Sequence, residues 1–492
     1  MATVKKTSID IALNGCELWR DADGNGYVSL KGGTEENYPL NSNAFRRWLS
    51  GAVYTATKAA VRKETLDEAI RVLEHEAQSG RVYPIGIRSC GHDGKVYLDL
   101  CDQTRRVVEI GSVGWRIVAP SPVKFLRKTS MSALPAPETG GDLRVLVNLL
   151  NLPDEDARLL LIGFLLGALM PGGPFIILVL SGEQGTGKTT AAKAIKFILD
   201  PSDRAPLRSR PKDEPQLLLW AQSCLILGLD NLSYLPQWMS DSLCRLSTGG
   251  RHSVRKLYTD GDEYFLDAQK PVILTGIEDI VNRGDLIDRS IIIHLPQITD
   301  DTRVPEEEVW AILSRERPRI LGALLDGVSC ALRKRTEVKL PSKPRMLDFA
   351  IWVTAAEEAL GWTEGSFLAA YQANRRHAFE IGLESSLFYK MLAVVILPGE
   401  KFVGTASDLL QRLKGAEKTG KIEEAGALPR HASKTSGELR KIAPGLRQIG
   451  WTVNFPPRGK LRLIEIVRPG EGVEKDSVDS VEPTEDPLDG LP

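Results

Sequence analysis

The N-terminal part of the chain alternates between helical and strand-like patterns of apolar residues. Apolar side chains recur every three or four positions over residues 66–77, which predicts an amphipathic helix that begins at a capping box of Thr65 and Glu68 and ends at Gly80. Short alternating runs predict strands around residues 82–88, 95–100 and 107–110. We therefore expect a mixed α/β domain of unassigned role over residues 1–140.

The central part contains unbroken apolar runs instead. Four such runs, typical of strands buried on both faces of a parallel sheet, occupy residues 175–180, 224–229, 271–274 and 290–295. Helical stretches separate them, so the pattern predicts an α/β domain with a parallel sheet over residues 141–385. Residues 132–142 are rich in proline and glycine, and we expect them to form a linker in front of this domain.

Beyond residue 385 the order of patterns changes again. Two helices and then two strands are predicted over residues 405–414, 433–449, 451–455 and 461–467. This order is similar to a winged helix, so we expect a winged-helix-like domain over residues 386–470. Its candidate DNA contacts are basic residues of the second helix and of the hairpin tip: Lys434, Arg440, Lys441, Arg447, Arg458 and Lys460. A protein-docking domain with a charged face is the alternative.

Composition restricts the class of protein. The 492 residues, 26% of them charged and 42% hydrophobic, correspond to about three domains. The longest apolar run, residues 159–170, is shorter than the roughly 20 residues of a membrane-spanning helix, and the first residues lack the apolar core of a secretory signal. The six cysteines are scattered, which argues against a disulfide framework or a zinc ribbon. We expect a cytoplasmic protein without a membrane partner.

Charge is unevenly distributed, although the formal net charge is only −1. Residues 401–470 hold 14 lysines and arginines against 6 acids, whereas residues 471–492 hold 8 acids against one lysine. The basic module fits a domain that binds a polyanion such as DNA. The acidic tail has almost nothing apolar to bury, so we expect it to be disordered.

The strongest chemical signal follows the first central run. Residues 182–189 read Gly-Glu-Gln-Gly-Thr-Gly-Lys-Thr and lead into a helical stretch, which is the P-loop pattern in its strand–loop–helix context. Backbone N–H groups of such a loop surround the β-phosphate, Lys188 reaches the β- and γ-phosphates, and the Thr189 hydroxyl ligates Mg²⁺. We expect ATP and Mg²⁺ as cofactors, with binding residues Gly182, Glu183, Gln184, Gly185, Thr186, Gly187, Lys188, Thr189 and Thr190.

Polar residues end two further runs. Asp230 is placed to hold the Mg²⁺ water shell together with Thr189, and Thr275 is suited to orient a water near the γ-phosphate. With the Asp-Leu-Ile-Asp-Arg element at residues 285–289, these motifs resemble an AAA+-type ATPase. More closely, residues 141–385 resemble the helicase superfamily 3-like ATPases of phage, plasmid and integrative-element replication, of the primase–helicase C-terminal type.

The resemblance implies roles for single residues. It makes Asp230 the Walker B carboxylate, Thr275 the sensor 1 residue and Arg289 an arginine finger that acts in a neighbouring subunit's site. The protein would then be a homo-oligomer, such as a hexameric ring. A salt bridge of Arg289 with Asp285 or Asp288 is the alternative. Two other arginines are secondary candidates, as a finger and as a sensor in a helical lid respectively: Arg283 and Arg345.

Asn231 departs from the pattern of these ATPases. Many of them carry a Glu or Asp beside the Walker B Asp to polarise the attacking water, and an amide can orient water but cannot take its proton. Either hydrolysis is slow, or a carboxylate such as Glu263 or Asp241 substitutes. We still include Asn231 among the candidate catalytic residues.

A predicted β-hairpin precedes the Thr275 strand. Aromatic and β-branched residues flank Asp260-Gly261, which favours a tight turn. In superfamily 3 helicases a hairpin at this place projects into the ring pore and grips DNA. The resemblance therefore makes four residues candidate DNA contacts: Arg251, His252, Arg255 and Lys256. An ordinary solvated hairpin is the alternative.

Two acidic patterns in the N-terminal part resemble metal sites that we do not favour. Residues 21–26 match the first half of a calcium loop, but Gly32 occupies the position of the bidentate Glu, so a hairpin turn is preferred. Asp99 and Asp102 resemble the paired carboxylates of a primase, but their spacing puts them on opposite faces of a strand. We expect a solvated strand edge there.

The sequence thus predicts an ATP-dependent DNA helicase or DNA-remodelling motor of mobile-element replication, which acts on single-stranded or forked DNA with a primase or another replication partner. The alternative is a nucleotide-gated oligomeric switch or adaptor, in phage defence or transposition control, without unwinding activity. A small-molecule kinase is a distant third, because it gives the basic module and residues 285–289 no role.

Overall fold

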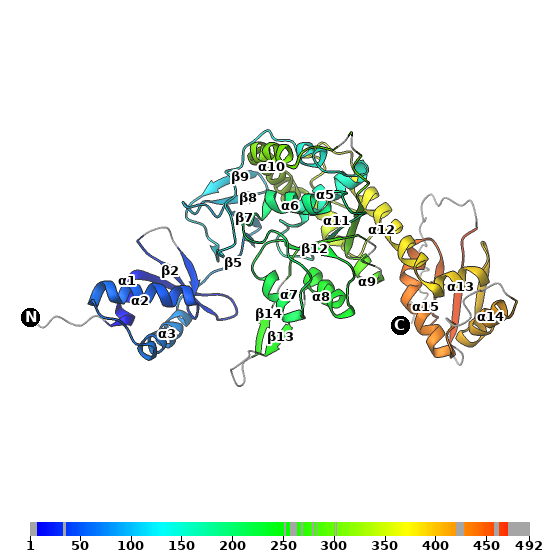
Figure 1. Ribbon diagram of the computed structural model, residues 1–492, viewed down its shortest axis with the longest axis horizontal. Helices are drawn as coiled ribbons and strands as arrows, with labels where there is room; N and C mark the ends of the chain where they lie inside the picture. The colour runs from blue at the N-terminus through cyan, green and yellow to red at the C-terminus, as the bar shows by residue number, and fades with distance from the viewer. Residues whose placement is uncertain are drawn as a thin grey trace, which may run out of the picture. The chain divides into compact units, whose positions relative to one another are not determined.

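The computed structural model describes residues 7–32, 36–249, 252–255, 263–266, 269–277, 280–281, 283–299, 301, 303–419, 428–456 and 462–470 (Figure 1). The chain divides into two compact units, Met1–Ala378 and Phe379–Pro492. The predicted domain limits at residues 140, 385 and 470 remain predictions. Over the described part of the chain, every helix is too short or too polar to cross a membrane.

The first unit begins with a small sheet and three helices. The sheet order is β3-β2-β1-β4, from Asn37–Pro39, Gly26–Leu30, Cys16–Arg20 and Arg81–Val82. The helices are α1 (Ser8–Gly15), α2 (Asn43–Thr57) and α3 (Lys63–Gln78). Their apolar side chains form a core of their own that includes Val28, Phe45 and Leu73.

The apolar face predicted over residues 66–77 is the buried face of α3. The predicted capping box is wrong, because α3 begins at Lys63 with Arg62 as its N-cap, so that Thr65 and Glu68 already lie inside the helix. Lys63 and Glu64 are good helix formers, so the helix begins two residues before Thr65. After its end, a Cβ on Gly80 would lie 2.7 Å from the carbonyl oxygen of Leu18, so only glycine fits there.

A second, antiparallel sheet belongs to the central core. Its strands are β6 (Ser89–His92), β7 (Lys95–Asp99), β8 (Val107–Gly111) and β9 (Gly114–Val118), and two short strands, β5 (Ile85–Gly86) and β10 (Lys124–Phe125), pair beside it. Leu98 and Val108 share one cluster with the helices that surround the central sheet. Trp115 Nε1 donates to Asp326 at 2.8 Å on α10 (Glu306–Lys334), which fixes this sheet to the central helix.

The segment predicted as a linker, residues 132–142, is packed on α10. Glu138 N donates to the carbonyl oxygen of Pro318 at 2.9 Å, and Leu134 is buried. A Cβ on Gly322 would lie 1.8 Å from the carbonyl oxygen of Glu138. The segment is therefore held in place and is not a free spacer.

The central sheet is parallel, as predicted. Its order is β12-β15-β11-β16, from Leu227–Leu232, Val272–Gly276, Ile177–Ser181 and Ser290–His294. The chain connects β11 to the strands on one side and then crosses to β16 on the other. The change of direction lies between β11 and β16, and in α/β sheets ligands bind outside the carboxyl ends of the strands at such a point.

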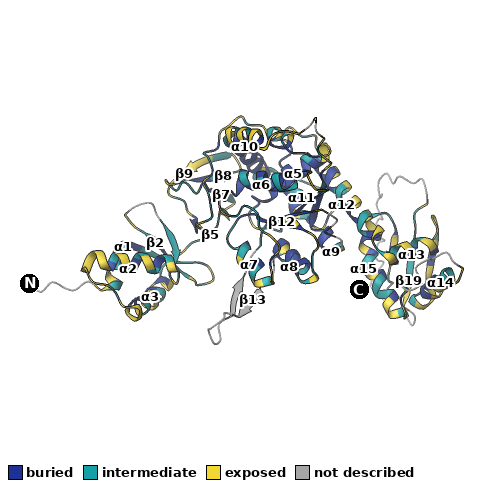
Figure 2. Ribbon diagram, viewed as in Figure 1, coloured by how far each residue is buried: buried dark blue, intermediate teal, exposed yellow. Residues whose placement is uncertain are grey.

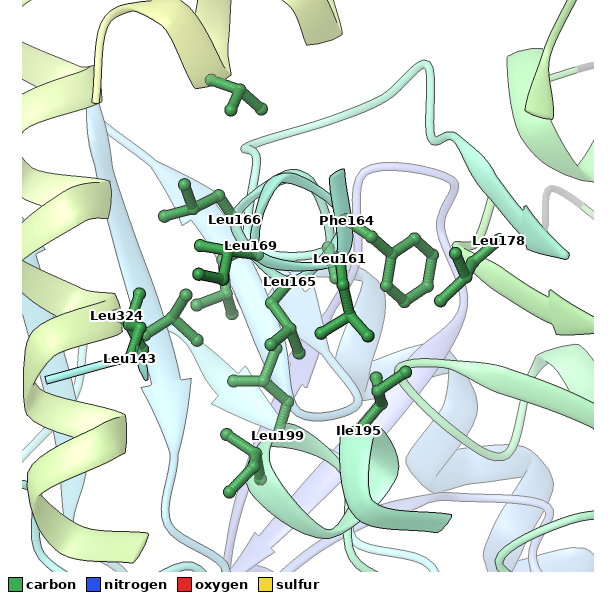
Figure 3. Packing of buried hydrophobic residues seen from close by; sticks show 14 of the residues in the cluster. Leu143, Leu161, Phe164, Leu165, Leu166, Leu169, Leu178, Ile195, Leu199 and Leu324 are labelled. Atoms are coloured by element: carbon green, nitrogen blue, oxygen red, sulfur yellow. The ribbon is translucent and has the colours of Figure 1, made fainter. Parts of the chain in front are cut away.

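Helices surround this sheet: α4 (Arg144–Asn148), α5 (Glu155–Gly167), α6 (Lys188–Leu199), α7 (Glu214–Ala221), α8 (Gln237–Thr248), α9 (Gly284–Ile287), α10, α11 (Leu347–Thr354) and α12 (Ser366–Glu384). The apolar run at residues 159–170 is mostly α5, which is buried around its circumference. Figure 3 shows Phe164 of α5 beside Leu178 of β11, and Leu161 and Leu165 of the same helix directed toward Ile195 and Leu199 of α6. Buried residues are concentrated on the central sheet and these helices (Figure 2).

The second unit follows the order helix, strand, helix, helix, strand, strand. These elements are α13 (Leu387–Val395), β17 (Lys401–Thr405), α14 (Ala406–Lys418), α15 (Ala432–Gln448), β18 (Thr452–Asn454) and β19 (Leu463–Val467), and the sheet order is β17-β19-β18. Leu409, Leu439 and Ile466 lie in its core. The two helices and two strands predicted here are present, whereas α13 and β17 were not predicted.

Candidate functional site

Residues 182–187 connect the carboxyl end of β11 to α6 and depend on glycine for their path. The backbone φ angles are 144° at Gly182, 86° at Gly185 and 86° at Gly187, all in the region that side chains disfavour. A Cβ on Gly182 would also lie 2.6 Å from the carbonyl oxygen of Leu295, directly after β16. The glycine spacing seen in the sequence therefore has a geometric cause.

The N-terminus of α6 and Lys188 place several donors together. Gly187 is the N-cap and no side chain caps the helix, so the first-turn N–H groups have no side-chain acceptor. Lys188 Nζ donates to the carbonyl oxygen of Gly182 at 2.7 Å and to Thr186 Oγ1 at 3.2 Å. Burial lowers the pKa of Lys188, and Asp230 opposes this. N–H groups, a helix dipole and an ammonium in one place form an arrangement that suits phosphate oxygens.

Asp230 links the loop helix to the neighbouring strand. Thr189 Oγ1 donates to Asp230 Oδ1 at 3.0 Å and lies 3.3 Å from Oδ2, and Thr275 Oγ1 donates to Oδ1 at 2.5 Å. Thr275 is 1% exposed. The structure thus brings together the three side chains that the sequence placed on α6, β12 and β15, and hydroxyl and carboxylate oxygens of this kind are the ligands that Mg²⁺ prefers.

Asn231 lies next to Asp230 in an unusual conformation. Its φ is 56°, in the left-handed region that Asn tolerates better than most residues, and the register of β12 against β15 shifts between Leu229 and Leu232. Its backbone N–H donates to Thr275 Oγ1 at 2.9 Å, whereas the residue is exposed. Of its two proposed substitutes, Asp241 is paired with Arg283 at 2.7 Å, and the side chain of Glu263 lies outside the description.

Other residues hold the loop from distant parts of the chain, and sequence reasoning missed them. Asn151 Nδ2 donates to the carbonyl oxygens of Thr186 at 3.1 Å and Pro296 at 2.6 Å. His294 Nδ1 lies 2.7 Å from Ser181 Oγ at the start of the loop. No local pattern marks Asn151, because its partners are 35 and 145 residues away. Of the predicted loop residues, Glu183 and Gln184 are exposed and Thr190 is half-buried.

Arg289 lies at the opposite edge of the sheet from the loop. It directly precedes β16 and its carbonyl oxygen accepts from Ile177 N at the amino end of β11, whereas the loop leaves the carboxyl end. Arg289 is 7% exposed and is paired with Asp285, which is the alternative stated above. Arg345 also lies 3.5 Å from Asp285. Within the described residues, none of the three candidate arginines forms an ion pair or hydrogen bond with residues 182–189.

The predicted hairpin is formed by β13 (His252–Arg255) and β14 (Glu263–Leu266), which pair in antiparallel register from His252↔Leu266 to Arg255↔Glu263. Of the four candidate DNA contacts, Arg251 and Lys256 lie outside the described residues. For His252 and Arg255 the structure gives the backbone alone.

The basic residues of α15 divide into two groups. Arg447 donates through Nε and Nη2 to the carbonyl oxygen of Val453, at 3.0 and 2.7 Å, and Arg440 stacks over the ring of Phe455 at 4.0 Å. Both therefore attach α15 to the chain around β18. Lys434 is exposed, and Lys441 is exposed and paired with Glu438 at 2.8 Å. Arg458 and Lys460 lie outside the described residues.

The N-terminal acids take structural roles. Asp21 accepts from Asn25 N at 2.8 Å and Asn25 Nδ2 at 2.8 Å, as the hairpin turn between β1 and β2 predicts. The expected solvated edge at Asp99 is wrong, because Asp99 is fully buried and Arg127 holds it through Nε at 2.8 Å and Nη2 at 2.5 Å. Throughout the part of the chain that the structure covers, no three His, Cys, Asp or Glu side chains are grouped to hold a metal.

Two family models and several solved structures are similar to this chain. Residues 143–377 match the model of the actinomycete integrative conjugative element replication protein, and residues 390–480 match that of the RepA C-terminal domain of these elements. Among solved structures, the chain is similar to "SCCmec type IV Cch - active helicase", with 13% identity and a TM-score of 0.46 over 92% of each chain. It is also similar to the apo NrS-1 C-terminal region, with 13% identity and a TM-score of 0.42 over 95% of this chain and 100% of that one. The curated proteins contain no match.

Proposed function

We propose that the chain is a replication protein of an actinomycete integrative conjugative element and acts as an ATP-dependent DNA helicase or DNA-remodelling motor. The matches of residues 143–377 and 390–480 to the two models of this family support the first part of the proposal. The observation that carries the proposal is the contact of Thr189 and Thr275 with Asp230 beside the loop of residues 182–187. Replication of a mobile element needs DNA strands to be opened, and nucleotide hydrolysis is the means that such a site supports.

The residues present fit ATP and Mg²⁺. The loop N–H groups and Lys188 would hold the phosphates, and Thr189 and Asp230 would hold the ion. Bound Mg²⁺ neutralises charge that develops on the phosphates during transfer. Thr275 fixes Asp230 Oδ1 and accepts from Asn231 N, so it sets the direction of the carboxylate and the backbone bulge at once. A mutation at Thr275 would disturb both.

Arg289 supports a shared site. Arg289 directly precedes β16 (Ser290–His294) and therefore lies five residues, or about 16 Å at 3.3 Å per residue, from the level where β11 ends and the loop begins. At that distance Arg289 does not reach its own loop, so under the resemblance it would serve a site in an adjacent copy. Release from Asp285 would accompany that contact, because Arg289 is buried against it. We therefore propose a homo-oligomer, with a hexameric ring as the form that the resemblance implies.

DNA is the proposed substrate of both basic regions. In the second unit, strand β17 is followed by helices α14 and α15 and then by strands β18 and β19, and the three strands form one sheet. This order supports a winged-helix-like domain. Lys434 and Lys441 are seven residues apart on α15, hence on one face, and both are exposed. We propose that this face contacts DNA phosphates, and that the β13–β14 hairpin contacts the single strand.

Unwinding of a forked DNA duplex tests the proposal. The wild-type chain should separate the strands with ATP, and Lys188→Ala should not, because the variant lacks the ammonium that the phosphates need. Lys95→Ala is a matched control, since Lys95 lies on β7 in an ion pair with Glu109 at 3.2 Å and has no part in the site. ATP hydrolysis by the wild type without any strand separation, at all protein concentrations, would refute the motor.

Asn231 favours a second candidate, a nucleotide-controlled switch that assembles on the element's DNA without unwinding it. The amide stands where a proton-accepting carboxylate is expected, and Asp241 is paired with Arg283. Such a switch binds ATP tightly, turns it over slowly and changes its oligomeric state. Light scattering with and without ATP distinguishes the two candidates, because an unchanged size excludes the switch.

A further inference from the structure

A cavity of about 400 Å³ lies between the C-terminal half of α6, the segment after it and α10. Phe197 of α6 and Trp310 of α10 form an aromatic wall, with ring centroids 5.5 Å apart in an edge-to-face arrangement. Ser132, from the segment packed on α10, also lines it. The volume is at the lower end of the range for small-molecule sites and excludes a polymer.

Arg317 lines this cavity and forms no ion pair within the described part of the chain. It is 8% exposed, and its Nε and Nη2 atoms have no hydrogen-bond partner among the described residues. The other three arginines that are equally buried each pair with an aspartate: Arg88 with Asp200, Arg289 with Asp285 and Arg375 with Asp288. The Arg317 guanidinium instead lies over the ring of Phe197, 4.0 Å from its centroid.

The groups around Arg317 also bear on how its positive charge is compensated. Burial lowers the pKa of Arg317 to about 10, Arg88 contributes in the same direction, and the carboxylate of Asp203 opposes both. Lys193 adds a second cation to the lining, which also includes the acid Glu306, and Glu306 accepts from Trp310 Nε1 at 3.0 Å. The buried Ser132 Oγ has no hydrogen-bond partner among the described residues. Asp203 is exposed at the rim and lies beyond ion-pair distance of Arg317. A buried cation without a partner is costly, and an anion in the cavity would offset that cost.

We propose that this cavity binds a small organic phosphate, with its phosphate group on Arg317 and Lys193 and its planar or apolar part against Phe197 and Trp310. Two cations and a hydroxyl suit a phosphate dianion better than a carboxylate, which has one charge and two oxygens. The aromatic wall provides a surface for a ring. The site is separate from the loop of residues 182–187, since none of these residues lines it and its first lining residue on α6 is Lys193.

Calorimetric titration with phenyl phosphate tests this site. The full chain carrying Lys188→Ala is used, so that the result does not depend on nucleotide binding at the loop. We expect one bound molecule per chain. Adding Arg317→Gln should weaken binding at least tenfold, whereas Arg319→Gln, an exposed arginine on the same helix, should leave it unchanged. Phenyl phosphate should also raise the melting midpoint of the parent chain and not that of the Arg317→Gln chain.

Three outcomes would overturn the proposal. The first is no binding of phenyl phosphate by the parent chain, and the second is equal binding after Arg317→Gln. The third is equal binding of benzoate, which would show that a carboxylate serves as well. Asp203→Asn adds a further check: it should strengthen phosphate binding by removing a nearby negative charge, and a lowered melting midpoint with unchanged binding would show instead that Asp203 is the partner of Arg317 in solution.

Discussion

Gly182 is the residue on which the path of the loop at residues 182–187 depends most. It combines a φ of 144° with the close approach of the Leu295 carbonyl, so any side chain must displace the strand end of β16 as well as strain the backbone. The sequence motif predicted that glycine belongs here. It did not show why, because Leu295 lies more than a hundred residues further along the chain.

Gly182→Ala should therefore abolish ATP binding and lower the free energy of unfolding by more than Gly185→Ala. Gly185 also has a positive φ but open space around its Cβ, so its substitution costs only the backbone strain, about 1–2 kcal/mol. Binding of a fluorescent ATP analogue and denaturant unfolding measure the two effects. Wild-type nucleotide affinity in Gly182→Ala would contradict the account of the loop.

Asn231 can be tested by stability alone. Its φ of 56° suits Asn and Gly and disfavours Ala. Asn231→Gly should therefore be more stable than Asn231→Ala by about 1 kcal/mol in denaturant unfolding. Equal stability of the two variants would show that the left-handed conformation beside Asp230 is not present in solution.

Asp99 shows where reasoning from single residues fails. Alternation along one strand gives the face of a side chain but not what covers it, and the partner of Asp99, Arg127, follows 28 residues later. Long-range pairs of this kind leave no local pattern. The same limit concealed Asn151, whose partners are 35 and 145 residues away. The pairing of Arg289 with Asp285, by contrast, joins residues four apart and could be named as an alternative from the sequence.

At the scale of elements, helix α6 has charged side chains at both ends. Its N-terminus carries Lys188, and its C-cap residue Asp200 binds Lys196 Nζ at 2.8 Å and lies 3.6 Å from Arg88 Nε. The sequence pattern predicted the strands of the central sheet correctly, because continuous apolar runs are typical of buried parallel strands. The sequence pattern placed the start of α3 too late, because Thr and Glu three residues apart form the same pattern inside the first turn of a helix as at its N-cap.

Asp200→Asn should destabilise the chain in a pH-dependent way. Burial alone raises the pKa of Asp200, but Lys196 and Arg88 outweigh it and hold the pKa below the ordinary 3.8. The charged carboxylate therefore contributes its stabilisation above about pH 4, and this is lost as the pH falls through the lower folded-state pKa. At pH 7 the variant should lose about 3–5 kcal/mol, because two cations remain buried.

Urea unfolding of the wild type and of Asp200→Asn between pH 7 and pH 3 measures this difference. Asp142→Asn removes an exposed pair with Arg144 and should cost less than about 1 kcal/mol. A stability difference for Asp200→Asn that stays constant down to pH 3 would contradict the proposed ionisation.

At the scale of the whole molecule, packing on α10 unites regions that the sequence had separated. The sheet of β6–β9 and residues 132–142 share contacts with α10, so the N-terminal region is partly a support of the central domain. Proline and glycine predicted a spacer, but they also allow a close approach such as that of Gly322 to Glu138. The pattern of residues in one chain does not indicate which surfaces would meet in the proposed oligomer.

The most direct test of the central claim is ATP hydrolysis by wild type, Lys188→Ala, Arg289→Ala and an equal mixture of the two variants, each with and without single-stranded DNA. DNA should stimulate the wild type, and each variant alone should lose this activity, for Arg289→Ala by about 10³-fold or more. The mixture should regain activity, because a copy with Lys188 then meets a neighbour with Arg289. Full DNA-stimulated activity of Arg289→Ala alone, or a mixture no more active than its parts, would contradict a shared-site DNA motor.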